Sequence, residues 1–357
     1  MLLRNLGALP LHKGQKVAYI GAFAAHPRYS AGHPRAPQVT SAIDAAVLHD
    51  RKIRYIEGFP ADRDQRDEAE FLRAVAAAEA ADAAVIFAGL PECAELAAAD
   101  RRHMRLPECQ NNLIARVAAV QKNTVVVLHT SGPVECPWAD DVSSVLCMYL
   151  AGEGLGEATD ALLWGDADPC GRLPETWPLR LEDTPCYLDF PGDGVTADYR
   201  EGVYVGYRWY DARKMPVRWP FGHGLSYTGY VYRGAALNAD TLTPGGTVTA
   251  RVTVKNSGAM RGAEVVQPLW WPTPAGARAG RAGAPGAAQV CEDRPAARRG
   301  AGDRLYADAA GYKPLQPRAA RLVRRAGPVR NTHRAFEPGH PHGAGLTVCG
   351  RKNLSLL

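Results

Sequence analysis

The sequence has no run that approaches the roughly 18 consecutive apolar residues of a membrane-spanning helix, so we expect no membrane association. It has no N-terminal apolar stretch with a small-residue cleavage site, which predicts the absence of a secretory signal. None of its eight cysteines forms a C-x-x-C pair, which argues against a zinc ribbon or a thioredoxin-like site. We therefore predict reduced, mostly buried thiols in a cytoplasmic protein.

The composition is that of a globular protein. Hydrophobic residues make up 46% and charged residues 22% of the 357 residues, which excludes a wholly disordered or fibrous chain. Residues 15–178 alternate apolar strand-like runs with alanine-rich stretches of helical period. Strands are expected at 16–20, 54–56, 84–88, 124–129 and 142–149, and helices at 39–48, 68–81, 110–120 and 156–164.

Uninterrupted apolar strands that alternate with helices are typical of a parallel sheet covered on both faces, so we predict an α/β fold. Ligands of such sheets bind beyond the carboxyl ends of the strands. The loops that follow Ile20, Ala88 and His129 are therefore the expected ligand-facing segments.

The remainder of the chain has a different character. Residues 179–235 are rich in Tyr, Pro and Gly and are expected to form an extended linker packed on its neighbours. Residues 247–254 alternate with period two, and 264–267 are expected to begin the next strand of a β-sandwich. From 271 to 350 about two-thirds of the residues are Ala, Gly, Pro or Arg, a bias that predicts a disordered tail. The excess of arginine raises nucleic-acid binding as an alternative, but no aromatic residues interleave with the arginines regularly, and we predict no nucleic-acid partner.

Four stretches carry a family resemblance, namely 13–21 (KGQKVAYIG), 100–107 (DRRHMRLP), 163–178 (LWGDADPCGRLPETWP) and 221–228 (FGHGLSYT). With them, residues 1–267 resemble the C-terminal half of a glycoside hydrolase family 3 enzyme of the β-glucosidase type. The resemblance implies a three-layer α/β sandwich over 1–178, followed by the linker at 179–235. After the linker it implies a truncated fibronectin type III-like domain at 236–270. We interpret residues 271–357 as the product of a frameshift near codons 267–272; the alternative is a natural low-complexity tail.

The resemblance also implies how catalysis is divided. Relatives carry an N-terminal barrel that supplies the nucleophile from a Ser-Asp-Trp motif, and this sequence contains no Ser-Asp-Trp. The acid/base of the family lies in a loop written Glu-Ser-Glu-Gly-Tyr-Asp-Arg. When that loop is anchored on Asp100 and Arg101, the acid/base position is occupied by Ala97. The nearest carboxylate is Glu95, which either substitutes for the acid/base or is a solvated loop carboxylate. No catalytic residue is therefore assigned, and Glu95, Asp100 and Arg101 are predicted to bind substrate.

Two functional hypotheses follow. The first is a truncated β-glucosidase-type protein that is inactive alone, whose intact relatives hydrolyse O-glycosyl bonds of small carbohydrates. The alternative is a non-catalytic carbohydrate-binding or partner module that completes a separately encoded barrel. No cofactor is expected, and the spacing of Asp166, Asp168 and Glu175 suits a turn better than a metal site.

A missing barrel has a further expected consequence. Leu96, Met104 and Leu106 would lie on the face that the barrel normally covers, so we predict that they are exposed to solvent. A large exposed apolar patch would favour self-association.

Overall fold

The computed structural model describes residues 1–29, 39–95, 100–239, 247–267, 304–306 and 341–349. They belong to two compact units. The first consists of Met1–Thr184, Val217–Trp219 and Gly224–Tyr227, and the second of Pro185–Pro216, Pro220–His223 and Thr228–Leu357. Across these described ranges, no helix combines the length and the apolar character needed to cross a membrane.

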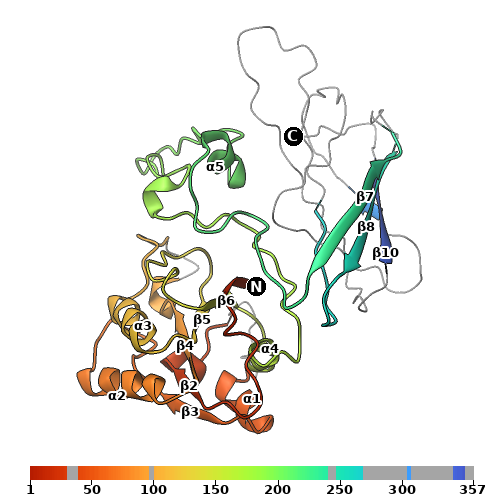
Figure 1. The fold of residues 1–357 in the computed structure, drawn as a ribbon. Coiled ribbons are helices and arrows are strands. Elements are labelled where there is room, and N and C mark those ends of the chain that lie inside the picture. The colour runs from red at the N-terminus through yellow and green to blue at the C-terminus, as the bar shows by residue number, and fades with distance from the viewer. Residues whose placement is uncertain (30–38, 96–99, 240–246, 268–303, 307–340, 350–357) are drawn as a thin grey trace. The chain divides into compact units, whose positions relative to one another are not determined.

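A six-stranded sheet forms the centre of the first unit (Figure 1). Its strand order is β1-β6-β5-β4-β2-β3, and every neighbouring pair is parallel except β1 with β6. The prediction of a mostly parallel sheet is therefore confirmed, whereas the antiparallel edge strand β1 was not predicted. The strands are β1 (Leu2–Asn5), β2 (Val17–Ile20), β3 (Ile53–Ile56), β4 (Ala83–Gly89), β5 (Thr124–His129) and β6 (Ser144–Cys147).

Four helices accompany this sheet, namely α1 (Ala42–Leu48), α2 (Glu68–Glu79), α3 (Glu108–Val120) and α4 (Leu155–Leu163). α1 packs against α4, and α2 packs against α3 and lies on β2 and β3 (Figure 1). α1 begins at a capping box in which Ser41 and Asp44 satisfy each other's backbone N–H groups. Short 3-10 turns follow β2 at Ala22–Ala24 (η1) and β4 at Glu92–Ala94 (η2), and a third lies at Leu181–Asp183 (η3).

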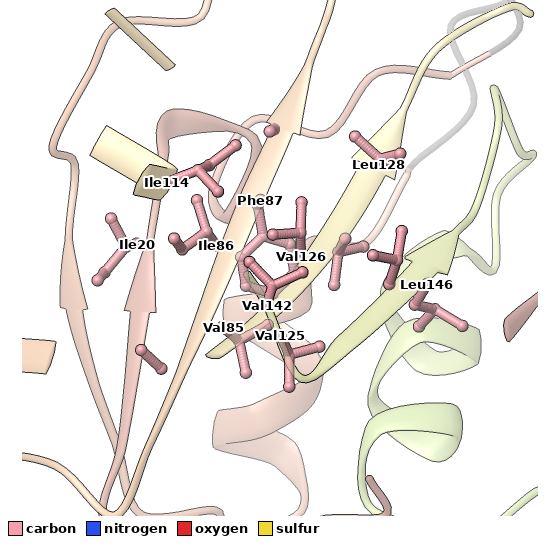
Figure 2. Packing of buried hydrophobic residues seen from close by; sticks show 14 of the residues in the cluster. Ile20, Val85, Ile86, Phe87, Ile114, Val125, Val126, Leu128, Val142 and Leu146 are labelled. Atoms are coloured by element: carbon pink, nitrogen blue, oxygen red, sulfur yellow. The ribbon is translucent and has the colours of Figure 1, made fainter. Parts of the chain in front are cut away.

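The core of the first unit lies on both faces of its sheet. Every residue of β2, β4, β5 and β6 is buried, so both faces of these strands are covered. Figure 2 shows Ile20, Ile86, Val126 and Leu146 packed across the four neighbouring strands. Burying one such side chain stabilises the fold by about 1.5–3 kcal/mol, so this dry core holds the strand ends in fixed positions.

The expected exposure of Met104 and Leu106 is wrong. Met104 is 4% exposed and Leu106 is 3% exposed, and Leu106 belongs to the main hydrophobic core. The backbone carbonyl of Met104 also accepts a hydrogen bond from the N–H of Glu135 at 2.8 Å, which ties this segment to the loop after β5. Leu96 lies outside the described residues. The chain therefore buries these apolar side chains within its own first unit.

The second unit differs from its prediction in three places. The expected linker contains the helix α5 (Tyr207–Arg213), which ends at the left-handed residue Lys214, and the linker range also includes the start of β7 (Tyr230–Leu237). Residues 264–267 form no strand. The expected disordered tail contains the strands β9 (Arg304–Tyr306) and β10 (Pro341–Cys349). The rest of that tail lies outside the described residues.

These strands enter one sheet with β8 (Thr247–Asn256), in the order β7-β8-β10-β9. Strand β10 pairs antiparallel with β8 along its whole length and parallel with β9. Backbone hydrogen bonds hold β10 in this sheet, and they need neither a helical nor an alternating apolar pattern in its sequence. The prediction of a disordered tail was made from amino-acid composition, and it therefore missed both β9 and β10.

Candidate functional site

Polar side chains converge beyond the carboxyl ends of four neighbouring parallel strands. We call this set the edge cluster, and its members are Arg28, Glu95, Arg101, Ser131, Tyr149 and Glu175. Arg28 follows β2, Glu95 and Arg101 follow β4, Ser131 follows β5, and Tyr149 follows β6. Parallel strands that lie side by side end at the same edge, and this brings residues so distant in sequence together.

Glu95 is the most enclosed member of the edge cluster. Its side chain is 1% exposed. Its Oε1 accepts hydrogen bonds from the backbone N–H of Ser131 at 2.6 Å and from the Ser131 hydroxyl at 2.7 Å. Its Oε2 lies 3.3 Å from Nη2 of Arg28. The interpretation of Glu95 as a solvated loop carboxylate is therefore wrong, and both of its oxygens are already engaged by protein groups.

Arg101 and Asp100 lie beyond the segment 96–99, which is outside the described residues and contains Ala97. The Arg101 side chain is 22% exposed, and its Nη1 lies 3.8 Å from Oε1 of Glu95. Its Nη2 donates to the backbone carbonyl of Pro133 at 2.8 Å. Asp100 is exposed. Of the three predicted site residues, Arg101 and Glu95 are in contact, and Asp100 faces solvent beside them.

Glu175 was not predicted as a site residue, although it lies in the stretch 163–178. Its Oε1 accepts a hydrogen bond from the Tyr149 hydroxyl at 2.9 Å, and Nε1 of Trp177 donates to the same hydroxyl at 3.1 Å. Burial raises the pKa of the Glu175 carboxyl, and the Tyr149 hydrogen bond and the charge of Arg101 oppose that rise. Nothing in the spacing of a lone glutamate indicates which strand ends it faces, so only the fold could locate it.

Tyr149 reaches Glu175 from an unfavourable backbone conformation. Its φ of 51° lies in the left-handed region, which is uncommon for a residue with a bulky side chain. Such a conformation costs of order 1–3 kcal/mol and persists only where the surroundings enforce it. Here the Tyr149 ring packs edge-on against Trp177, with ring centroids 6.3 Å apart. The strain shows that the position of this tyrosine at the strand end is determined by its tertiary contacts.

His129, the last residue of β5, lies beneath the edge cluster. It is 1% exposed and stacks on Phe23 and Phe87, with ring centroids 6.2 Å and 6.4 Å away. Among the residues that the structure describes, neither ring nitrogen has a hydrogen-bond partner. Burial, with a smaller contribution from the positive charge of Arg28, lowers the pKa of His129 to about 4. The imidazole is therefore neutral at pH 7 and enclosed within the core.

The three acids considered for a metal site make separate contacts. Asp166 pairs with Arg51, and Asp168 accepts hydrogen bonds from the Ser226 hydroxyl at 2.7 Å and from the Tyr227 backbone N–H at 2.8 Å. Glu175, as described, accepts from Tyr149. In the part of the chain that the structure describes, no group of three His, Cys, Asp or Glu residues is placed to hold a metal ion.

Comparisons with known proteins identify the family of this chain. Residues 1–227 match the model of the glycosyl hydrolase family 3 C-terminal domain. Thermostable beta-glucosidase B of Acetivibrio thermocellus is 42% identical over 274 residues, which are 75% of this chain and 36% of that protein. An exo-alpha-(1->6)-L-arabinopyranosidase of Bifidobacterium breve is 36% identical over 280 residues, which are 75% of this chain and 37% of that protein.

A solved structure shows the same fold. The GH3 beta-glucosidase of Bifidobacterium adolescentis matches with a TM-score of 0.76 at 29% identity, over 97% of this chain and 45% of that one. The chain spans little more than a third of the length of the two curated relatives. The family match extends over most of the chain and contains the whole edge cluster. The chain therefore belongs to glycosyl hydrolase family 3 and carries that family's C-terminal domain in residues 1–227.

Proposed function

We propose that this chain is the C-terminal portion of a β-glucosidase-type glycoside hydrolase, and that these 357 residues do not hydrolyse glycosides by themselves. A retaining glycosidase needs two carboxyl groups about 5–5.5 Å apart, one as nucleophile and one as acid/base. The observation that carries the proposal is the environment of Glu95. Its buried carboxylate is engaged by Ser131 and Arg28, and the position that the family resemblance assigns to the acid/base is occupied by Ala97.

The edge cluster supports a role in binding sugars. Asp100 is exposed and Arg101 is partly exposed at the edge where α/β sheets bind ligands. A carboxylate and a guanidinium together offer acceptors and donors for sugar hydroxyls. In this proposal Asp100 and Arg101 contact the carbohydrate, and Glu95 contributes by holding Arg101. The names of the curated relatives include a glucosidase and an arabinopyranosidase, so the sugar is left open.

The test uses the full purified chain with a nitrophenyl β-glucoside. We expect no release of nitrophenol above the buffer rate, because acid/base assistance alone contributes about 10²–10⁴-fold to such reactions. Glu95→Gln is the diagnostic variant. Glu92→Gln is its matched control, since Glu92 is exposed and lies three residues earlier in the same loop. Turnover by the wild-type chain that Glu95→Gln abolishes and Glu92→Gln preserves would refute the proposal and make Glu95 the acid/base.

A second candidate function is a partner module for a separately encoded barrel. The observation that favours it is that the first unit has a continuous buried core and an assembled edge cluster, although the chain as a whole matches only 36% of its relative from Acetivibrio thermocellus. The test mixes the full chain with the N-terminal part of that relative, made without the region that matches this chain. Glucosidase activity in the mixture and in neither component alone would favour this function. An inactive mixture that becomes active with Ala97→Glu would instead favour a module that has lost its acid/base.

A further inference from the structure

Two carboxylates of the edge cluster differ in what they can still bind. Glu95 is 1% exposed, and Ser131 and Arg28 engage both of its oxygens. Glu175 is partly exposed, and its Oε1 accepts a hydrogen bond from the Tyr149 hydroxyl at 2.9 Å. Its Oε2 makes no hydrogen bond or ion pair with the residues that the structure describes, and this oxygen is not buried. Glu175 therefore keeps one carboxylate oxygen that can accept a hydrogen bond from a ligand.

The Glu175 side chain borders the same space as the Arg101 side chain. A Cβ added to Gly132 would lie 3.9 Å from Oε1 of Glu175 and 3.9 Å from Nη2 of Arg101. No hydrogen bond or ion pair joins Glu175 to Arg101 in the described part of the chain. Because position 132 is a glycine, no side chain fills the space between them. This space adjoins the loop after β5, at the sheet edge where ligands of α/β folds bind.

We propose that Glu175 is a third residue that contacts the carbohydrate, beside Asp100 and Arg101, and that its Oε2 accepts a hydrogen bond from a sugar hydroxyl. This inference rests on the proposed sugar site and adds to it a residue outside the predicted acid/base loop. An ionised carboxylate only accepts hydrogen bonds and a hydroxyl group donates one, so the ligand class is a hydroxyl-rich molecule such as a monosaccharide.

The Glu175 carboxylate is held in one orientation before a ligand binds. The Tyr149 hydroxyl donates to its Oε1, and the indole N–H of Trp177 donates to that hydroxyl at 3.1 Å. Trp177 is fully buried and packs edge-on against Trp219, with ring centroids 5.3 Å apart. A series of contacts therefore runs from the aromatic core through Tyr149 to Glu175. Groups held in this way are preorganised, and binding loses less free energy to ordering them.

Binding through Glu175 has a pH dependence whose sign follows from its surroundings. Burial raises the pKa of the Glu175 carboxyl, while the Tyr149 hydrogen bond and the charge of Arg101 oppose that rise. Cys147 is the other titratable group that acts on this carboxyl. As the pH falls through the raised pKa, the carboxylate takes up a proton and Oε2 becomes a weaker acceptor, since charge-assisted hydrogen bonds are about twice as strong as neutral ones. Affinity for a sugar should therefore fall in acid.

The first experiment titrates the full chain, labelled with nitrogen-15, with D-glucose at pH 7 and at pH 5 and follows binding by NMR. Glu175→Gln should weaken glucose binding about tenfold at pH 7, because a hydrogen bond to a charged group is lost. The variant should also lack the fall in affinity that wild type shows at pH 5. Glu182→Gln, at an exposed position later in the chain, is the matched control and should bind glucose as wild type does.

A second variant tests the same site without changing a charge. Gly132→Val adds atoms that meet Arg101 and Glu175 at ordinary contact distance, so the fold should be retained while the space for a ligand is filled. We expect it to weaken glucose binding about tenfold or more, as the loss of one charged hydrogen bond does. Gly152→Val is its control, because a Cβ at that glycine has no neighbour within 4 Å.

Chemical labelling of the full chain measures directly whether Oε2 of Glu175 is accessible. A water-soluble carbodiimide with glycinamide converts accessible carboxyl groups to amides, and mass spectrometry locates the modified residues. We expect labelling of Glu175 and none of the enclosed Glu95 in the folded chain. Glucose should slow the labelling of Glu175 and leave that of the exposed Glu182 unchanged.

The outcomes separate this inference from the site on which it rests. If Glu175 resists labelling in the wild-type chain, its Oε2 is enclosed and the inference is wrong. If wild type binds glucose, and Glu175→Gln and Gly132→Val bind it equally well, Glu175 does not contact the sugar, and the proposed site at Asp100 and Arg101 stands. If wild type binds no glucose, the proposed sugar site fails and this inference fails with it.

Discussion

The substitution His129→Phe is predicted to remove a loss of stability that the wild-type chain suffers in acid. His129 is enclosed between Phe23 and Phe87, and neither ring nitrogen has a hydrogen-bond partner in the described part of the chain. An imidazolium cannot be solvated in this position, and the pKa of His129 is lowered from 6.5 to about 4. The unfolded chain exposes the same ring to water, where the pKa has its ordinary value.

The magnitude follows from these two pKa values. Between them the unfolded chain binds more protons than the native one, so the free energy of unfolding falls as pH falls from 6.5 towards 4. The difference of 6.5 minus 4 corresponds to about 3 kcal/mol in full. Most of this effect, about 2 kcal/mol, should be lost between pH 7 and pH 5. The variant lacks the titrating group and therefore lacks this component.

The assay is urea unfolding at pH 7 and at pH 5, followed by tryptophan fluorescence. The first unit contains four buried reporters, Trp138, Trp164, Trp177 and Trp219. The quantity compared is the change in unfolding free energy between the two pH values, so a constant packing cost of the larger phenyl ring cancels. His12→Gln, at an exposed position, is the control and should behave as wild type. Equal losses in wild type and His129→Phe would show that the buried-imidazole reasoning is wrong.

Three further predictions concern stability, each measured by urea unfolding of the full chain. Asp160 is fully buried and pairs with Arg51, so Asp160→Asn should cost about 3–5 kcal/mol, and a cost near zero would contradict the role of that pair. Ser41→Ala removes the N-cap of α1 and should cost about 1 kcal/mol, with Ser41→Asn retaining most of the stability. Gly89→Ala places a Cβ 2.2 Å from the backbone carbonyl oxygen of His129 and should abolish the folded first unit; a stable variant would mean that β4 and β5 can separate there.

Local sequence pattern predicted the centre of the fold well. Strand β5 was predicted at 124–129 and lies there, because a continuous β-branched run has one stable environment, a sheet buried on both faces. Strand β1 escaped prediction, because four residues carry little pattern and its place depends on antiparallel pairing with β6. Helix α5 was missed for a similar reason, since its sequence lacks a helical period and its end is marked only by the left-handed Lys214.

The family and the loops that bear the site could also be inferred from the sequence. Stretches such as 163–178 carry the resemblance, and a parallel sheet predicts that the loops after β2, β4 and β5 share one edge. Burial could not be inferred in this way. Met104 and Leu106 were expected to be exposed and are buried, because other segments of the first unit cover them.

The roles within the edge cluster were decided by tertiary structure alone. Glu95 is held by Ser131, 36 residues away, and Glu175 is held by Tyr149, 26 residues away. Sequence determines which groups are available, since hydrophobic pattern and motif are local properties of the chain. Whether a carboxylate contacts solvent, an arginine or a hydroxyl depends on which strand ends pack side by side. That arrangement is determined only by the complete tertiary structure.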